Sequence, residues 1–177
     1  MNDGELFLAR SRYYLSSEYL PKIKKCVDAL PPDAIWRRAN ESSNSIGNLL
    51  LHLAGNVRQW IVKGIGGKDV HRDRASEFSA REGASGRELI ENLERALVEA
   101  DSVLAGLTPA DLARPHVMQE RDNTVLTAIY HVVEHFSLHL GQIVLLAKLH
   151  APGAIAFYED AGGLAEPVWE HLIRDRG

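Results

Sequence analysis

The chain has 177 residues, of which 45% are hydrophobic and 25% are charged, which is an ordinary composition for a globular protein. This length predicts one domain over residues 1–177 that buries a sizeable core and does not need a metal ion merely to fold. The formal net charge of −4 leaves no basic excess to neutralise phosphates, so we expect no nucleic-acid partner.

The first predicted helix covers residues 4–30. Its apolar residues recur at helical spacing and form one stripe: Tyr13, Leu20, Ile23, Val27 and Leu30. Pro21 has no amide hydrogen, so we expect a kink between Ser17 and Pro21. The pair Pro31 and Pro32 ends this helix.

The second predicted helix begins after Asn44 or Ser45, both of which are good N-cap residues. Its buried face is predicted to contain Ile46, Leu49, Leu50, Leu53, Val57, Trp60 and Ile61. Gly64, Gly66 and Gly67 end it. Residues 68–84 then form a long, charged connection without predicted structure, and connections of this length are often functional or cross over the fold.

The third predicted helix begins at a capping box formed by Ser85 and Glu88. Its apolar stripe is Leu89, Leu93, Ala96, Leu97, Ala100 and Leu104, and Gly106 ends it. Thr108 and Pro109 are typical of the start of one short helical turn, with Thr108 as the N-cap.

The fourth predicted helix begins near Asp122 or Asn123 and ends near His150. It is apolar over more than one face, which indicates a central helix. Residues 151–164 are predicted to be a loop, and residues 167–174 a short terminal helix. Long helices with one long crossover between the second and third predict an all-α four-helix bundle, in which those two helices can run parallel.

Three histidines of the fourth helix lie four residues apart, namely His131, His135 and His139. Side chains at this spacing share one helix face, so two neighbouring histidines can bind the same metal ion. His52 is the candidate third ligand, because a free imidazole amid leucines is otherwise hard to explain. The spacing leaves open which pair on the fourth helix binds, and a buried histidine can also be a simple core residue.

Three histidine ligands with open positions suit a reactive divalent transition metal, with zinc or nickel first among the choices. Asn56, Gln142 and Glu134 are candidates for the groups around the ligands, although each can also be an ordinary solvated or capping residue. In the charged connection, Arg72 and Arg74 are candidate contacts for an anionic substrate, with a solvated ion-pair cluster as the alternative.

Three stretches carry a resemblance to a known family. The segment Ser45–Asn56, followed by Arg58-Gln59-Trp60, resembles the second helix of the DinB-like superfamily of metal-binding bundles. The segment His131–Ile143, with histidine, glycine and glutamine near its end, resembles the fourth helix of that superfamily. Arg72-Asp73-Arg74 with Glu77-Phe78 resembles one uncharacterised branch of it.

The resemblance implies specific expectations. It selects His52, His135 and His139 as the metal ligands and leaves His131 outside the set. It implies an up-down-down-up bundle, often a homodimer, and a metal-dependent transferase that moves a low-molecular-weight thiol to a small-molecule substrate. The alternatives are a non-catalytic metal- or ligand-binding dimer and a metal-dependent hydrolase, both of which would use the same histidines.

The remaining sequence features bear on the cellular compartment of the protein. A single cysteine, Cys26, excludes an intrachain disulfide and fits a reducing environment, and its place on the apolar stripe indicates a packing role. The first residues show no signal-peptide pattern, and uninterrupted apolar runs are far shorter than the ~20 residues of a membrane helix. We therefore expect a cytoplasmic protein without a membrane partner.

Overall fold

The structure is a computed structural model that describes residues 1–118 and 121–169. The first helix of the bundle is built from α1 (Asp3–Tyr13), the π-helical η1 (Tyr14–Tyr19) and α2 (Leu20–Asp28). The second is α3 (Ile46–Val57), continued by the π-helical η3 (Arg58–Ile65). The third is α5 (Gly86–Ala105), and the fourth is α6 (Val125–His150).

Shorter elements connect these helices. They are the 3₁₀ turns η2 (Pro32–Trp36) and η4 (Pro109–Ala113), the helix α4 (Arg74–Ser79), and the strands β1 (Pro115–Met118), β2 (Arg121–Thr124), β3 (Tyr158–Ala161) and β4 (Leu164–Pro167). The strands form two antiparallel hairpins, in which Pro115 pairs with Thr124 and Tyr158 pairs with Pro167.

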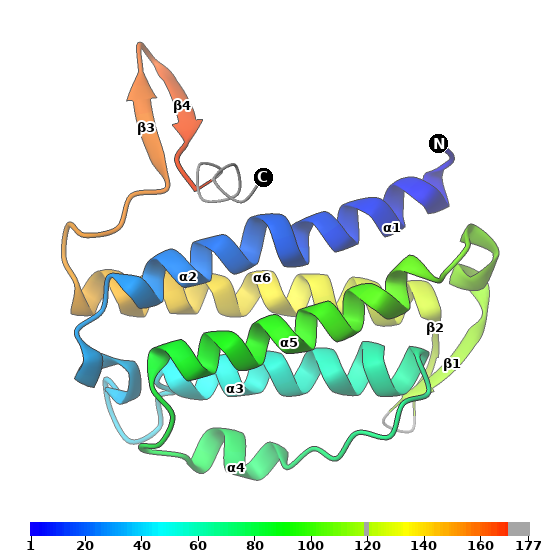
Figure 1. Cartoon of the computed structure of the whole chain (residues 1–177), viewed down its shortest axis with the longest axis horizontal. Coiled ribbons are helices and arrows are strands. Elements are labelled where there is room, and N and C mark those ends of the chain that lie inside the picture. The colour runs from blue at the N-terminus through cyan, green and yellow to red at the C-terminus, as the bar shows by residue number, and fades with distance from the viewer. Residues whose placement is uncertain (119–120, 170–177) are drawn as a thin grey trace.

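The long helices have the predicted up-down-down-up order (Figure 1). The segment between α3 and α5 carries the chain back along the length of the bundle, so that α3 and α5 run in the same direction. α3 packs against both α5 and α6, and α2 packs against α6. The predicted all-α bundle with a crossover between its second and third helices is confirmed.

The expected kink in the first helix is a π-helical segment. η1 ends two residues before Pro21, so the wider turn lies where the proline amide cannot donate a helical hydrogen bond. Tyr14 stacks on Tyr19, which in turn stacks on Phe136 of α6, with ring centroids 5.5 and 5.9 Å apart. The irregular turn therefore also packs aromatic rings against the central helix.

The start predicted for the fourth helix was wrong. Asp122 and Asn123 belong to β2, and the helix begins at Val125 with Thr124 as its N-cap. The Thr124 side chain accepts a hydrogen bond from the Thr127 amide, which completes a capping box. Pairing with β1 keeps residues 121–124 extended. This pairing depends on residues 115–118, which a helix-capping pattern read around residues 122–124 does not include.

The connection between α3 and α5 was predicted to be structureless, and this prediction was wrong. The connection contains α4, whose N-cap Asp73 accepts a hydrogen bond from the Ser76 amide. Glu77 of this short helix is 7% exposed, so the connection packs against the bundle. α4 contacts α3, the helix that carries His52.

The end of the chain also differs from the prediction. The loop predicted over residues 151–164 contains β3, which pairs with β4 in a hairpin that projects from the bundle (Figure 1). The short helix predicted over 167–174 begins at a residue that belongs to β4. Residues 170–174 of that predicted helix lie outside the described part of the chain.

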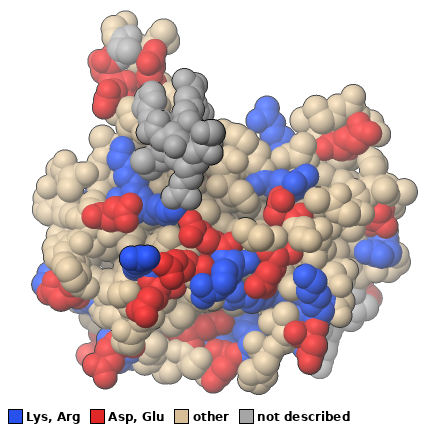
Figure 2. Space-filling view, in the orientation of Figure 1, with Lys and Arg blue, Asp and Glu red and all other residues tan. Residues whose placement is uncertain are grey.

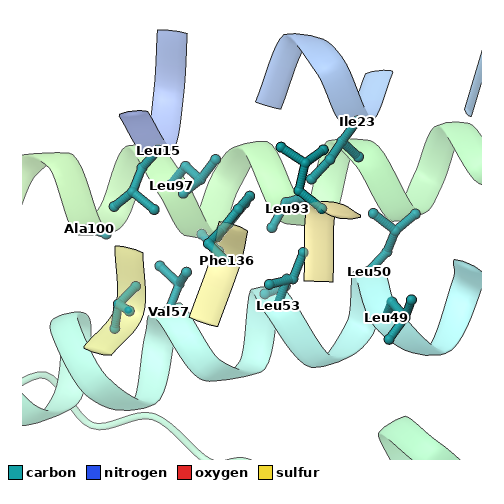
Figure 3. Close-up of a cluster of buried hydrophobic side chains, with 14 of the residues drawn as sticks. Leu15, Ile23, Leu49, Leu50, Leu53, Val57, Leu93, Leu97, Ala100 and Phe136 are labelled. Carbon is teal, nitrogen blue, oxygen red and sulfur yellow. The ribbon is translucent and has the colours of Figure 1, made fainter. Parts of the chain in front are cut away.

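Side chains from all four long helices meet in one core (Figure 3). Its fully buried members include Leu15, Ile23, Leu49, Leu50, Leu53, Leu93, Leu104, Ile129 and Phe136. Cys26 is also fully buried, and burial raises the pKa of its thiol to about 12. This thiol is therefore a packing group and not a nucleophile, as the sequence indicated.

The central helix α6 has a second apolar face. Five of its large apolar side chains are exposed: Leu126, Tyr130, Leu138, Leu145 and Leu149. By length and composition α6 could cross a membrane, a test that the core helix of a soluble bundle also passes. The face formed by α1, α2 and α5 is different, because acidic and basic side chains alternate across it (Figure 2).

Candidate metal centre

The fold brings three histidines together between α3 and α6. His52 lies in the middle of α3, whereas His135 and His139 lie one turn apart on α6. Each can offer one imidazole nitrogen, and these nitrogens all lie within 4.8 Å of one another. His52 is only 4% exposed, so the cluster sits at the edge of the core. The packing of α3 on α6 thus creates a possible metal site of three histidines.

The distances between the imidazole nitrogens fit a single metal ion. His135 Nε2 lies 3.0 Å from His52 Nε2 and 3.1 Å from His139 Nε2. A tetrahedral ion with metal–nitrogen distances of about 2.0–2.1 Å holds its ligand nitrogens about 3.3 Å apart. A small outward movement of the rings would therefore complete the coordination geometry.

Glu77 fixes the tautomer of His52. The Glu77 carboxylate lies 2.9 Å from His52 Nδ1, and an ionised carboxylate only accepts hydrogen bonds, so Nδ1 carries the hydrogen and donates it. Burial would raise the pKa of Glu77, but hydrogen bonds from Arg72 and His52 outweigh it and hold this pKa below its ordinary value. His52 Nε2 is then left with a free lone pair that faces the other histidines.

Gln142 plays the same part for His139. Its side-chain oxygen lies 2.7 Å from His139 Nδ1 and accepts the hydrogen of that nitrogen. His139 Nε2 therefore also presents a lone pair to His135 Nε2. One hydrogen on His135 can serve only one of these two lone pairs, whereas a cation satisfies all three Nε2 atoms. His135 Nδ1 is buried without a hydrogen-bond partner among the described residues.

His135 and His139, the two histidines that α6 contributes to the cluster, are neutral near pH 7, which is the form that binds metal. Burial, followed by the charges of His139 and His52, lowers the pKa of His135 to about 3. Burial also lowers the pKa of His139, although its bond to Gln142 opposes the shift. No proton needs to be removed from these two rings before an ion enters at neutral pH.

The crossover, residues 66–85 between η3 and α5, closes one side of the three-histidine cluster. Arg72 Nε and Nη2 donate to the two oxygens of Glu77, each at 2.7 Å, and Arg72 Nη1 donates to Gln59 on η3. Gly55 of α3 makes room for this pair, since a Cβ atom there would lie 2.1 Å from Glu77 Oε1. The crossover thus packs closely against α3 at Gly55, where no side chain is in the way, next to His52.

A pocket of about 300 Å³ opens beside the histidines. It is lined by His52, Asn56, Trp60, Arg72, Arg74, Asn123, His131 and His135. Trp60 lies against His131, with ring centroids 4.4 Å apart, and these rings give the pocket an aromatic wall. The side-chain oxygen of Asn56 is buried without a partner among the described residues. A ligand in this pocket would contact the metal site directly.

The sequence-predicted site residues divide into three groups. Asn56, Arg72, Arg74 and His131 line the pocket, and Gln142 contacts His139. Arg72 is not part of a solvated cluster, because its buried partner is Glu77. Glu134 is exposed on α6 and is not among the residues that line the pocket.

Sequence reasoning missed the roles of Glu77, Gln59 and Trp60. Glu77 was noted only as part of a resemblance, and its contact with His52 spans 25 residues. The one available signal was Gly55, a glycine inside a helix three residues after the candidate ligand. Such a glycine indicates close packing against that helix face.

A larger groove of about 730 Å³ lies between α5 and the first helix of the bundle, formed by α1, η1 and α2, away from the histidines. Its charged groups are already paired, since Arg12 donates to both oxygens of Asp101 and Lys24 donates to Glu94. Among the described residues, the cluster suited to hold a metal ion is that of His52, His135 and His139. The smaller pocket is therefore the better candidate for a functional site.

Fold and site together define the class: a DinB-like helical bundle with a possible three-histidine metal site. It matches a DinB-like protein from Bacillus subtilis with a TM-score of 0.64 and 17% identity, covering 85% of this chain and 98% of the other. A DinB-like protein from Bacillus cereus ATCC 10987 matches with a TM-score of 0.60 and 16% identity, covering 79% and 94%. These identities establish the shared fold alone.

More particularly, the chain belongs to the family described as "Protein of unknown function (DUF1572)", whose model matches residues 2–154. No curated protein matches the chain. The DinB-like fold that the sequence resemblance implied is confirmed. The function of the protein has to be argued from the site itself.

Proposed function

We propose that the protein binds one divalent transition-metal ion, zinc or nickel, and transfers a low-molecular-weight thiol to a small electrophilic substrate. The observation that carries this proposal is the convergence of three imidazole Nε2 atoms, from His52, His135 and His139, beside an open pocket. Three protein ligands with free positions are typical of reactive metal sites, whereas structural sites are closed by a fourth protein ligand.

An ion held by three neutral imidazoles keeps its double positive charge and supplies Lewis acidity, which lowers the pKa of a bound thiol or water. The protein's own groups prepare the site for this chemistry. Glu77 and Gln142 orient two of the rings. His131 lines the pocket, and burial lowers its pKa, so it is neutral near pH 7 and can accept the thiol proton on a ring nitrogen.

The donor set favours a thiol over water as the nucleophile. Metal-dependent hydrolases commonly use a free carboxylate as the general base that activates water. Among the described residues the carboxylate closest to the histidines is that of Glu77, and it is buried and engaged by Arg72 and His52. A thiol has an ordinary pKa of about 8.5 and needs less help than water to ionise.

Cobalt substitution tests the proposal. A cobalt–sulfur bond gives an intense near-ultraviolet charge-transfer band that oxygen ligands do not give. We expect this band when cobalt-loaded protein is titrated with small thiols, and we expect binding to tighten as the pH rises through neutrality, because the thiol binds as thiolate. The His52→Ala variant is the control and should give no band.

The other outcomes separate the alternatives. A protein that binds cobalt but gives no band with any thiol does not bind thiols at its metal, and hydrolysis or non-catalytic ligand binding then replaces the transferase. A band without turnover, measured with a generic electrophile such as a haloaromatic compound, would indicate a binding module. Failure to bind any transition metal would overturn the whole proposal.

A further inference from the structure

The charges around the pocket beside the histidines are unbalanced. Arg72 and Arg74 both line the pocket, and Glu77 is the carboxylate that neutralises one of them. In the described part of the chain, the residues that line the pocket include no acidic side chain. One guanidinium charge therefore has no counter-charge among the described residues, next to the possible metal site.

Arg72 is not the group that carries this excess. Its Nε and Nη2 donate to Glu77, its Nη1 donates to Gln59, and its side chain is 9% exposed. A guanidinium that is held in this way on all of its nitrogens has little capacity left for a ligand. Arg72 instead supports Glu77, which in turn orients His52.

Arg74 has the opposite surroundings. It is exposed, and its guanidinium lies over the ring of Phe78, 4.9 Å from the ring centroid. Phe78 itself packs on His52, with ring centroids 4.6 Å apart. No carboxylate pairs with Arg74 in the described part of the chain. Stacking on Phe78 positions the guanidinium but leaves its N–H groups available.

Asn56 supplies an independent sign of a missing ligand. It is 5% exposed, lines the pocket, and its side-chain oxygen has no hydrogen-bond partner among the described residues. A buried amide oxygen without a hydrogen bond costs free energy, so we expect a ligand or an ordered water to donate a hydrogen bond to it. Asn56 lies one helical turn after His52, so this amide adjoins the metal site.

We propose that the pocket recognises a small molecule bearing a carboxylate, with Arg74 binding the carboxylate and the Asn56 amide bonding to a polar group of the same molecule. The planar guanidinium matches a carboxylate with two parallel hydrogen bonds. A volume of about 300 Å³ limits the ligand to a small molecule, and the rings of Trp60 and His131 contact its apolar part. This inference rests on the proposed function, because it identifies the transferred thiol as an acidic one.

The test compares two thiols of equal length, 3-mercaptopropionate and 3-mercapto-1-propanol, on cobalt-loaded protein. We expect the acidic thiol to bind about tenfold more tightly, as measured by the charge-transfer band at constant pH and salt. In Arg74→Gln the acidic thiol should lose this advantage, while the affinity for the neutral thiol stays the same. Arg74→Lys keeps the charge but not the planar fork, and should recover part of the preference.

Arg87→Gln is the matched control, since Arg87 is an exposed arginine on α5 and its variant changes the net charge by the same amount. Its preference for the acidic thiol should equal that of the wild type. Equal affinities of the wild type for both thiols, or an unchanged preference in Arg74→Gln, would overturn the acidic-ligand inference and leave the thiol proposal standing.

If neither thiol gives a band, the proposed thiol chemistry fails, and propionate then tests the carboxylate site by itself. Its binding is followed by tryptophan fluorescence, with Trp60→Phe identifying the signal from the pocket. Propionate binding that Arg74→Gln abolishes supports a carboxylate site that serves different chemistry. No binding of propionate to the metal-loaded wild type overturns the inference.

Discussion

At the scale of single residues, the orientation of two histidine rings is set by hydrogen bonds of their Nδ1 atoms, which point away from the centre of the site. Glu77 and Gln142 each accept a hydrogen from an Nδ1 atom, and this turns the Nε2 atoms of His52 and His139 toward His135. The centroid of the His131 ring lies 5.4 Å from that of the His135 ring, but His131 packs against Trp60 in the pocket wall, with ring centroids 4.4 Å apart. The position of each ring thus distinguishes the three candidate ligands from His131.

The first prediction concerns the ligands. Protein reconstituted with zinc or nickel should carry close to one ion per chain. His52→Ala, His135→Ala and His139→Ala should each weaken metal binding by more than the roughly 10–100-fold that removing an outer partner costs, whereas His131→Ala should retain the ion. Elemental analysis after dialysis measures this. Loss of the ion in His131→Ala with retention in His139→Ala would show that the pair lies one turn earlier.

The second prediction concerns Glu77. Glu77→Gln keeps the shape of the side chain but removes the charge that holds the Nδ1–H tautomer of His52. We expect metal affinity to fall roughly 10–100-fold without loss of the fold. Calorimetric titration with zinc provides the measurement, and Glu134→Gln, an exposed change on α6, serves as its control. Equal affinities of the two variants would contradict a positioning role for Glu77.

The third prediction is a pH dependence of the metal-free protein. Burial, with the neighbouring histidines, lowers the pKa of His135 to about 3, whereas an imidazole in an unfolded chain has a pKa of about 6.5. Between these values the unfolded chain binds the extra proton, so the contribution of His135 to stability is complete above about pH 6.5 and is lost as the pH falls toward about 3.

Chemical denaturation of the metal-free wild type and of His135→Leu measures this contribution. The difference between their free energies of unfolding should shift in favour of the variant as the pH is lowered from about 7 to about 4. A difference that stays constant across this range would show that His135 is not buried in its neutral form.

At the scale of elements, α3 and the crossover form one unit around the site. The crossover supplies Arg72, Arg74 and Glu77, and α3 supplies His52 and the glycine that lets Glu77 approach. The hairpin of β1 and β2 adds Asn123 to the pocket wall. The crossover and the β1–β2 hairpin, which both differ from the sequence-based expectation, therefore contribute to the surroundings of the histidines.

Gly55→Ala tests this unit. Its Cβ would lie 2.1 Å from Glu77 Oε1 and 2.8 Å from Arg72 Nε, so the pair must move away from His52. We expect the amides of α4 to exchange hydrogen faster and metal affinity to fall about as much as in Glu77→Gln, roughly 10–100-fold. Gly106→Ala is the control, since the nearest atom to its Cβ would be at an ordinary 3.5 Å. Unchanged exchange and affinity in Gly55→Ala would mean that the crossover does not depend on this contact.

At the scale of the whole molecule, the exposed apolar row on α6 has no cover from the described part of the chain. Tyr130, Leu138, Leu145 and Leu149 are each more than half exposed and follow one side of the helix. Exposed apolar rows of this kind mark interaction sites, and a second copy of the same helix offers a complementary row. The homodimer expected from the sequence therefore remains our prediction.

Light scattering should give twice the chain mass of 19.6 kDa at micromolar concentration. Leu145→Lys introduces a charge into the row and should shift the protein toward monomer, whereas Val98→Lys, at an exposed apolar residue of α5, should not. A wild type that is monomeric at this concentration would contradict a dimer, and an unchanged dimer in Leu145→Lys would place the interface elsewhere.

The features that depend on local periodicity and helix caps are readable from the sequence alone. The helix stripes, an N-cap at Asn44 or Ser45, the capping box at Ser85, and the histidines spaced four apart on α6 are all readable because each signal lies within a few residues. The bundle order and the three clustered histidines follow from these signals together with the family resemblance.

The groups that complete the site are set by the packing of the folded chain and are not readable from the sequence. Glu77 meets His52 across 25 residues, Arg72 meets Gln59 across 13, and His52 meets His135 across 83. No periodic pattern encodes such contacts, because they arise when the crossover packs on α3 and buries a carboxylate that needs a partner. The same packing occupied Arg72 and left Arg74 available, although the two arginines stand two residues apart in one charged segment.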